Sequence, residues 1–270
     1  MNSDTSNPSG SVIYLSHGGG PLPLLSDPNH QGLLDFIKAA VPLLIQPTAI
    51  VVISAHWECR QPTITSAASP ALIYDYYGFP EAAYHIQYPV QGAPAWAEKI
   101  FKCVENAGIT AQLDNQRGFD HGVFVPLKLM YPQANIPCVQ LSLVNSLQPE
   151  LHIQLGKAIA GLKKERVLII GSGLSFHNIN AFFAQSTSAT KAMNEAFEQW
   201  LIETCSSSLL TESERTQRLL NWRNAPAADY CHPRAEHLLP LHVCYGAAGA
   251  AAKQVFAFEI LGKKTSAYIW

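Results

Sequence analysis

The sequence predicts an α/β protein built on a central, mostly parallel but mixed sheet that is flanked by helices. Two apolar runs, residues 49–55 (AIVVISA) and 166–171 (RVLIIG), show no regular polar alternation, which is typical of parallel strands covered on both faces. Strand and helix patterns alternate over most of the chain. With 270 residues, 48% of them hydrophobic, the chain is long enough to bury the core that such a sheet requires.

The first third of the chain predicts a strand, a helix and a second strand. Residues 29–44 place apolar side chains at helical spacing, whereas residues 74–80 (YDYYGFP) combine aromatic residues with glycine and proline, as in a structured loop. In chain order we expect a polar leader over 1–10, a strand over 11–16, a helix over 29–44, a central strand over 49–55, and weaker strands over 62–67 and 83–88 on either side of that loop.

The middle third continues the alternation. An amphipathic pattern over 93–106 is closed by Gly108, and glycine commonly follows the end of a helix. In chain order we expect a helix over 93–106, a strand over 109–113, a glycine-bounded loop over 118–122, a short helix over 123–130, a strand over 139–144, a helix over 149–162 and a strand over 166–171.

Helices dominate the last third, before a C-terminal hairpin. Residues 189–205, 211–222 and 236–247 have helical apolar spacing. Residues 255–261 and 265–270 are predicted to form a β-hairpin that adds edge strands to the sheet. Because no repeat, low-complexity tract or linker interrupts the chain, we expect residues 11–270 to form a single α/β domain.

Composition and charge argue against several classes of partner. Only 14% of residues are charged and the formal net charge is −2, so no basic patch is available for nucleic acid. No apolar run reaches the roughly 18 residues of a membrane span, and residues 1–10 lack the features of a signal peptide. We therefore expect a cytoplasmic protein. Its six cysteines lie far apart with no C-x-x-C pair, which predicts reduced, mostly buried thiols rather than a zinc ribbon or a disulfide framework.

Histidines follow three of the apolar runs. VIYLS leads to His17, IVVISA to His56, and VLIIGSGLSF to His177. Ligands of open parallel sheets bind outside the carboxyl ends of the strands, so side chains that leave successive strands converge there. Two or three histidines with open coordination positions are typical of a catalytic rather than a structural metal site. The pattern predicts a metal site at this edge of the sheet.

The other histidines do not share this placement. A single histidine is more often a hydrogen-bonded core or surface residue than a functional one. The residues for which we expect such roles are His30, His152 and His242, in helical segments, and His85, in a strand. His232, in a loop, is a weaker second candidate. The glycines at 18–20 would let the backbone approach a ligand closely, but they lack the G-x-G-x-x-G pattern and the lysine of phosphate-binding loops.

Five motifs occur in one order along the chain: Ser16-His17-Gly18, Ser54-Ala55-His56-Trp57, Gly118-Phe119-Asp120-His121-Gly122, His177-Asn178 and Glu236-His237-Leu238-Leu239-Pro240-Leu241. Together they resemble the 4,5-DOPA extradiol dioxygenase family, which belongs to the class III extradiol aromatic ring-opening dioxygenases. S-A-H-W and F-D-H-G in this order are the most specific of the five. The resemblance runs from about Val12 to the C-terminal strands.

The resemblance implies one non-haem metal ion held by His17, His56 and His237. It also implies that His177 is an acid/base residue close to the metal, with a role as a fourth ligand as the alternative. His121 would assist at the substrate.

Two positions qualify the resemblance. Many extradiol enzymes place a carboxylate in the third ligand position, and Glu236 adjoins His237. The family pattern favours His237 as the ligand, with Glu236 pointing elsewhere on the helix. Family members commonly carry H-G-S-P after the first strand, whereas the glycines at 18–20 follow His17 here, so we expect a difference in substrate entry or orientation.

The activity implied by the resemblance is ring opening of a catechol-type aromatic, DOPA-like or other, with O2. One divalent metal is expected per chain, Fe(II) for activity and Zn(II) in the protein as isolated, because imidazole sites bind zinc more tightly than ferrous iron. Neutral His177 would take up a proton from the catechol. Two alternatives stay open: a zinc-dependent hydrolase or lyase that activates water, and an inactive homologue that binds a metal or an aromatic compound.

Overall fold

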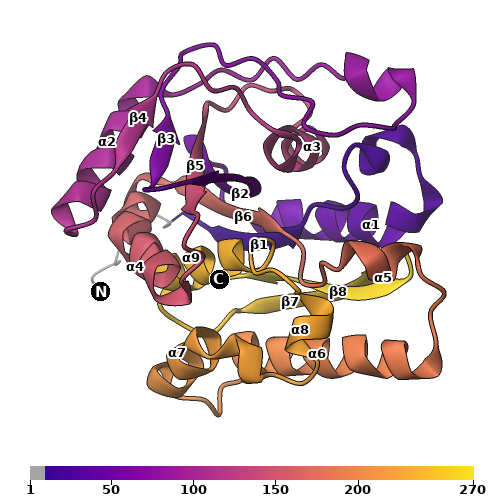
Figure 1. Ribbon diagram of the computed structural model, residues 1–270. Coiled ribbons are helices and arrows are strands. Elements are labelled where there is room, and N and C mark those ends of the chain that lie inside the picture. Colours follow the sequence, from indigo (N-terminus) through magenta and orange to yellow (C-terminus); the bar gives the residue numbers. More distant parts are fainter. Residues whose placement is uncertain (1–9) are drawn as a thin grey trace, which may run out of the picture.

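An eight-stranded mixed sheet forms the centre of the computed structural model, which describes residues 10–270 (Figure 1). The predicted leader over 1–10 therefore lies outside the described residues, except for Gly10. The strand order is β4-β3-β5-β2-β6-β1-β8-β7. In chain order the strands are β1 (Val12–Ser16), β2 (Ala49–Cys59), β3 (Thr63–Thr65), β4 (Gln112–Asp114), β5 (Cys138–Val144), β6 (Val167–Gly173), β7 (Gln254–Ile260) and β8 (Lys263–Ile269).

Helices lie on both sides of this sheet (Figure 1), which confirms the predicted fold class. They are α1 (Gln31–Ala40), α2 (Pro94–Asn106), α3 (His121–Met130), α4 (Pro149–Ile159), α5 (Ile179–Phe183), α6 (Ser188–Ser206), α7 (Glu212–Leu220), α8 (Ala228–Cys231) and α9 (Leu239–Ala248). Short 3-10 helices are η1 (Leu22–Leu25), η2 (Pro28–His30), η3 (Val41–Leu43), η4 (Glu81–His85), η5 (Ala160–Glu165) and η6 (Trp222–Asn224).

The four central strands run in one direction. β2 pairs in parallel with β5 and β6, and β1 pairs in parallel with β6. Antiparallel strands flank this centre, since β8 pairs with β1 and β3 pairs with β5. The carboxyl ends of β1, β2 and β6 therefore lie at one edge of the sheet, where ligands of such sheets bind.

Each central strand buries side chains on both faces. In β2, Val51 packs in the core that contains α4 and α9, whereas Ile50 packs in the core that contains α1 and α3. β1 divides in the same way, with Tyr14 in the first core and Ile13 in the second. Since both faces are covered, no position calls for a solvated side chain. This explains the continuous apolar runs and confirms that 49–55 and 166–171 are central strands.

The predicted strand over 83–88 is wrong. Residues Glu81–His85 form η4 instead, so His85 lies in a 3-10 helix. The backbone carbonyls here bind tyrosine hydroxyls rather than a neighbouring strand: Tyr76 donates to Ala83 at 2.6 Å, and Tyr74 donates to Ile86 at 2.6 Å. These partners come from the aromatic loop over 74–80, which no local pattern in 83–88 could indicate.

Two predicted boundaries near the histidines are also wrong. The loop over 118–122 is shorter than predicted, because α3 begins at His121. The helix over 236–247 begins later, at Leu239. Pro240 then occupies the first turn of α9, where a missing backbone N–H costs no hydrogen bond. Glu236 and His237 therefore precede the helix.

The C-terminal hairpin is present as predicted. Leu261 and Gly262 connect β7 to β8 with φ of 51° and 70°, as a two-residue turn between twisted strands requires. β8 lies between β1 and β7, so of the two hairpin strands β7 alone lies at an edge of the sheet. Within residues 10–270, no helix combines the length and apolar character needed to cross a membrane. All six cysteines are free and four of them are buried, as predicted.

Candidate metal centre

His17, His56 and His237 meet at the carboxyl ends of the central strands. His17 directly follows β1, but His56 lies within β2 rather than after it, which corrects the prediction. The pairing of β2 with β5 shifts register between Ile53 and Glu58, and an irregularity of this kind changes the direction of side chains. The Nε2 atoms of His17 and His56 are 3.1 Å apart. One ring nitrogen from each of the three histidines lies within 4.8 Å of the others.

His237 reaches this edge because its backbone is fixed against β1 and β6. Its carbonyl accepts hydrogen bonds from the Tyr14 hydroxyl at 3.0 Å and from the Leu174 backbone N–H at 3.1 Å. Gly173, the last residue of β6, makes this approach possible, since a Cβ there would lie 2.1 Å from the same carbonyl oxygen. The segment before α9 is thereby held close to the end of β6.

Ser172 determines which nitrogen of His17 carries the proton. The Ser172 hydroxyl donates its one hydrogen to the carbonyl of Gly122, and Nδ1 of His17 lies 3.0 Å from the same Ser172 oxygen. Because that oxygen has no hydrogen left to donate, it accepts from Nδ1–H. Neutral His17 therefore has its lone pair on Nε2, the atom that faces His56.

Glu236 binds two histidines at once. Its Oε1 lies 2.9 Å from Nδ1 of His237 and 3.1 Å from Nδ1 of His177. The two imidazoles are stacked with ring centroids 3.4 Å apart. The expectation that Glu236 points elsewhere is therefore wrong: Glu236 accepts from both rings, which places their lone pairs on Nε2.

Asp75 binds His121 in a similar way. Its Oδ1 lies 2.8 Å from Nδ1 of His121, and its Oδ2 lies 3.7 Å from Nδ1 of His56. The rings of His56 and His121 are 3.9 Å apart between centroids. The structure thus brings together all five histidines that the sequence singled out as site residues.

Burial lowers the pKa of the three central imidazoles. The pKa values of His17 and His56 lie well below the ordinary value, and that of His237 falls to about 3. Desolvation is the largest cause in each case, and the neighbouring imidazoles add to it. Burial by itself would raise the pKa of Glu236, but hydrogen bonds from His177 and His237 outweigh it and hold that pKa well below its usual range. The three imidazoles are therefore neutral, and the carboxylate of Glu236 beside them is ionised.

These residues fit a divalent transition metal. Metal–imidazole bonds of about 2.0–2.1 Å place adjacent ligand nitrogens roughly 3.0–3.4 Å apart, and the Nε2 atoms of His17 and His56 are separated by 3.1 Å. Two lone pairs that face each other at this distance repel unless a cation or a proton lies between them. Nitrogen ligands with no thiolate favour zinc, iron or copper over calcium or magnesium.

Comparison with known proteins agrees with this geometry. The family model described as the catalytic LigB subunit of aromatic ring-opening dioxygenase matches residues 10–268. The chain belongs to this family. The LigB match, together with the relatives described next, confirms the resemblance to class III extradiol dioxygenases and supports a dioxygenase activity on an aromatic ring.

Several LigB relatives cover most of the chain. The 4,5-DOPA dioxygenase extradiol of Beta vulgaris is 40% identical over 90% of this chain and 88% of its own length. The dioxygenase tasH of Hapsidospora irregularis is 40% identical over 96% of this chain and 85% of its own length. A crystal structure of the uncharacterized protein JW3007 from Escherichia coli K12 has a TM-score of 0.73 at 26% identity, covering 96% of this chain and 99% of that one.

The remaining histidines of this LigB protein have partners in the fold. Nε2 of His30 accepts from the backbone N–H of Gly19 at 2.9 Å, and Nε2 of His152 accepts from that of Val144 at 3.1 Å. The other three histidines also have partners: a ring nitrogen of His242 contacts the Leu219 carbonyl, one of His232 contacts the Ser175 carbonyl, and one of His85 contacts the Glu81 carboxylate. A Cβ on Gly18 would lie 2.8 Å from the His30 ring. Gly18 and Gly19 thus pack against His30, and Gly20 packs against Phe79, which accounts for small residues at these positions.

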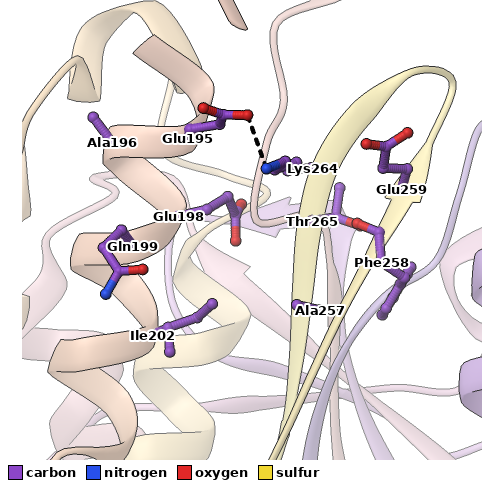
Figure 2. Close-up of a pocket in the computed structure, with 10 residues that line it drawn as sticks. All are labelled: Glu195, Ala196, Glu198, Gln199, Ile202, Ala257, Phe258, Glu259, Lys264 and Thr265. Atoms are coloured by element: carbon purple, nitrogen blue, oxygen red, sulfur yellow. Dashed lines mark hydrogen bonds and ion pairs between the residues drawn. The ribbon is translucent and has the colours of Figure 1, made fainter. Parts of the chain in front are cut away.

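A cavity of about 660 Å³ lies away from the LigB histidines, between α6 and the β7–β8 hairpin (Figure 2). Its walls include Phe258 and the ion pair between Lys264 and Glu195, whose atoms are 2.8 Å apart. No histidine lines it. Glu198 also borders this cavity, and burial raises the pKa of its carboxyl to about 7. The cavity is separate from the metal centre.

Three residues of the LigB site were not anticipated from the sequence. Ser172, Glu236 and Asp75 each bind an Nδ1 atom of a site histidine. Only Glu236 has a signal in the chain, its position next to His237, and the family pattern predicts that it points away. Ser172 and Asp75 lie far in sequence from the histidines that they contact, so spacing carries no information about them.

Proposed function

We propose that this protein is an extradiol dioxygenase that opens the ring of a catechol-type aromatic with O2 at one metal ion held by His17, His56 and His237. The observation that carries the proposal is the convergence of three neutral imidazoles from distant parts of the chain. When bound, Fe(II) would bring the diol and O2 together and supply the redox chemistry. The printed names of the relatives, dioxygenase and 4,5-DOPA dioxygenase extradiol, support the same reaction class.

The protein's own side chains handle the protons in this proposal. A catechol must lose a hydroxyl proton to bind through oxygen, and Nε2 of His177 is the base that takes it up, since Glu236 holds Nδ1–H of the same ring. The O–H bond breaks as an Nε2–H bond forms. The ionised carboxylate of Glu236 then stabilises the imidazolium, and the proton can return to an oxygen of the product. His121 assists at a substrate hydroxyl.

The direct test is anaerobic reconstitution of the full chain with Fe(II), followed by O2 uptake and absorbance across a panel of catechols. We expect one O2 consumed per catechol, a yellow semialdehyde product, and two labelled oxygen atoms when 18O2 is supplied. Product without O2 consumption would instead indicate a zinc-dependent hydrolase or lyase. Tight catechol binding to the Fe(II) protein with no O2 uptake would indicate an inactive homologue.

A further inference from the structure

Asp75 connects the aromatic loop to the first turn of α3. Its Oδ1 accepts from the backbone N–H of His121 at 3.0 Å and lies 2.8 Å from Nδ1 of the same residue. A carboxylate at this position also interacts favourably with the dipole at the start of the ten-residue helix. The Asp75 side chain is 23% exposed and that of His121 is 7% exposed. Asp75 therefore lies at the rim of the centre, and His121 lies inside it.

This contact determines the tautomer of His121. An ionised carboxylate can only accept, so Nδ1 of His121 carries a proton, and in the neutral ring Nε2 then carries the lone pair. Nε2 is on the side of the ring opposite Asp75. The ring centroid of His121 is 3.9 Å from that of His56 and 5.6 Å from that of His17. The neutral ring of His121 thus presents an acceptor, and not a donor, beside the metal centre.

The surroundings hold Asp75 and His121 in place from both sides. On the loop side, the ring of Tyr76 packs edge-on against His121 at 5.7 Å, and its hydroxyl donates to the Ala83 carbonyl. On the helix side, the buried carboxylate of Asp120 accepts from the Ser54 hydroxyl at 2.7 Å. The pair is therefore built into the fold before any substrate binds.

We propose that Asp75 is a positioning residue for ring opening, which holds His121 with Nδ1 protonated so that Nε2 accepts a proton from a diol hydroxyl. This role rests on the function proposed above. In the step, the O–H bond breaks, its electron pair stays on the diol oxygen, and an Nε2–H bond forms. The resulting imidazolium is paired with the Asp75 carboxylate.

The centre then holds two carboxylate–histidine pairs outside the metal-binding trio. Glu236 with His177 comes from the segments that follow β6 and precede α9, whereas Asp75 with His121 comes from the loop and α3. A catechol has two hydroxyl protons. If each carboxylate–histidine pair takes up one hydroxyl proton, the presence of two such pairs is explained.

The competing explanation is that Asp75 only caps α3. Two substitutions separate the explanations. Asp75→Ala removes the cap and the acceptor for Nδ1–H, whereas Asp75→Asn keeps an oxygen that can accept both hydrogen bonds but removes the charge. Thr211→Ala is the matched control, because the Thr211 hydroxyl caps the remote helix α7 by accepting from the Glu214 N–H.

The first measurement needs no metal. In the metal-free protein labelled with 15N-histidine, long-range 1H–15N NMR distinguishes a protonated ring nitrogen from one with a lone pair. For His121 we expect Nδ1 protonated in the wild type, Asp75→Asn and Thr211→Ala, and a shift toward protonated Nε2 in Asp75→Ala. A wild-type His121 with its proton on Nε2 would overturn the proposal, whether or not the protein opens rings.

The second measurement concerns proton uptake from a diol. With the Zn(II)-loaded protein and 4-nitrocatechol, whose absorbance reports its ionisation, we expect the fully deprotonated form in the wild type and Thr211→Ala. Asp75→Ala should bind a form that keeps one proton. Identical spectra in Asp75→Ala and wild type would overturn the role of His121 as acceptor.

Turnover gives a third measurement. With saturating Fe(II), kcat for the best catechol should fall about 10- to 100-fold in Asp75→Ala, the usual effect of removing an orienting partner, and less in Asp75→Asn, with KM nearly constant. An equal loss in Thr211→Ala would show that cap removal alone is responsible and would reject the proposal. Absence of ring opening in the wild type would refute the proposed function, and the NMR and nitrocatechol spectra would still decide the role of Asp75.

Discussion

At the scale of single residues, the centre is organised by the atoms behind the histidines. Three different acceptors hold Nδ1 atoms: the hydroxyl of Ser172, the carboxylate of Glu236 and the carboxylate of Asp75. Each of them directs a lone pair to Nε2. Partners of this kind usually change metal affinity or activity by about 10- to 100-fold when they are removed. The chemistry of the site therefore depends on residues that act through the histidines they hold.

The ligands and the base should separate by metal content. His17→Ala and His56→Ala remove a proposed ligand, so we expect purified protein with little bound metal and no ring opening. His177→Ala should keep the metal while ring opening falls by about 100-fold or more, the usual contribution of a general base. Elemental analysis and O2 uptake on the same samples are the measurements. Complete metal loss in His177→Ala would make His177 a fourth ligand.

Glu236 should affect ring opening and metal binding through the two histidines that it binds. Glu236→Gln keeps the shape of the side chain but removes its negative charge, and its amide can donate to an Nδ1 atom and reverse a tautomer. We expect ring opening to fall roughly 10- to 100-fold with weaker metal binding, as measured by O2 uptake and by competition with a chelator. Glu203→Gln is the control and should behave as wild type, because Glu203 lies on α6 in an exposed ion pair with Arg218 of α7. Unchanged kinetics in Glu236→Gln would exclude the shared hydrogen bonds from the mechanism.

At the scale of secondary-structure elements, the first turn of α3 packs closely against β2 beside the metal centre. The carbonyl of Gly122, in the first turn of α3, accepts from Ser172, which in turn orients His17. A Cβ on Gly122 would lie 2.3 Å from the Ser54 hydroxyl oxygen and 3.1 Å from the His56 ring. Only glycine lets the helix approach the strand this closely.

Gly122→Ala should therefore damage the centre through the backbone. We expect α3 to shift away from β2, with a loss of about 1–3 kcal/mol in the free energy of unfolding and weaker metal binding, measured by urea denaturation and by chelator competition. Gly161→Ala is the control, because a Cβ there meets no atom within 4 Å and should leave both quantities unchanged. A fully stable Gly122→Ala protein with normal metal affinity would refute this account of the contact.

At the scale of the whole molecule, stability depends on histidines buried in the neutral state. Burial is the largest cause that lowers the pKa of His152 to about 4 and of His232 to about 3. In the unfolded chain their pKa is about 6.5. Between these values the unfolded chain binds more protons than the folded protein, so stability falls as the pH falls below about 6.5.

The metal-free protein should consequently be sensitive to mild acid. Each of these two histidines should lower the free energy of unfolding by ~2 kcal/mol when the pH falls from 7.5 to 5. Urea denaturation with a chelator present measures this change. His85→Gln, at an exposed ring paired with Glu81, should show the same pH dependence as wild type. An unfolding free energy that does not change between pH 7.5 and pH 5 would contradict the prediction.

Elements whose burial leaves a pattern in their own residues were predicted correctly, whereas elements fixed by contacts with other segments were not. The central strands at 49–55 and 166–171 were predicted correctly because burial on both faces leaves a continuous apolar pattern. The predicted strand over 83–88 was wrong because tyrosine hydroxyls from the preceding aromatic loop, rather than a neighbouring strand, bind its carbonyls. The start of α9 was wrong for a similar reason, since contacts with Tyr14 and Leu174 hold His237 outside the helix.

The sequence by itself determined the α/β architecture, the edge of the sheet where histidines gather, and which five histidines lie together there, because hydrophobic periodicity and short motifs are local properties of a chain. The tertiary structure alone decided which nitrogen of each imidazole faces the centre and which residues hold it there. Hydrogen bonds to Ser172, Glu236 and Asp75 join segments that are distant in sequence or change with a few degrees of side-chain rotation. Such contacts exist only after the sheet has brought the segments together.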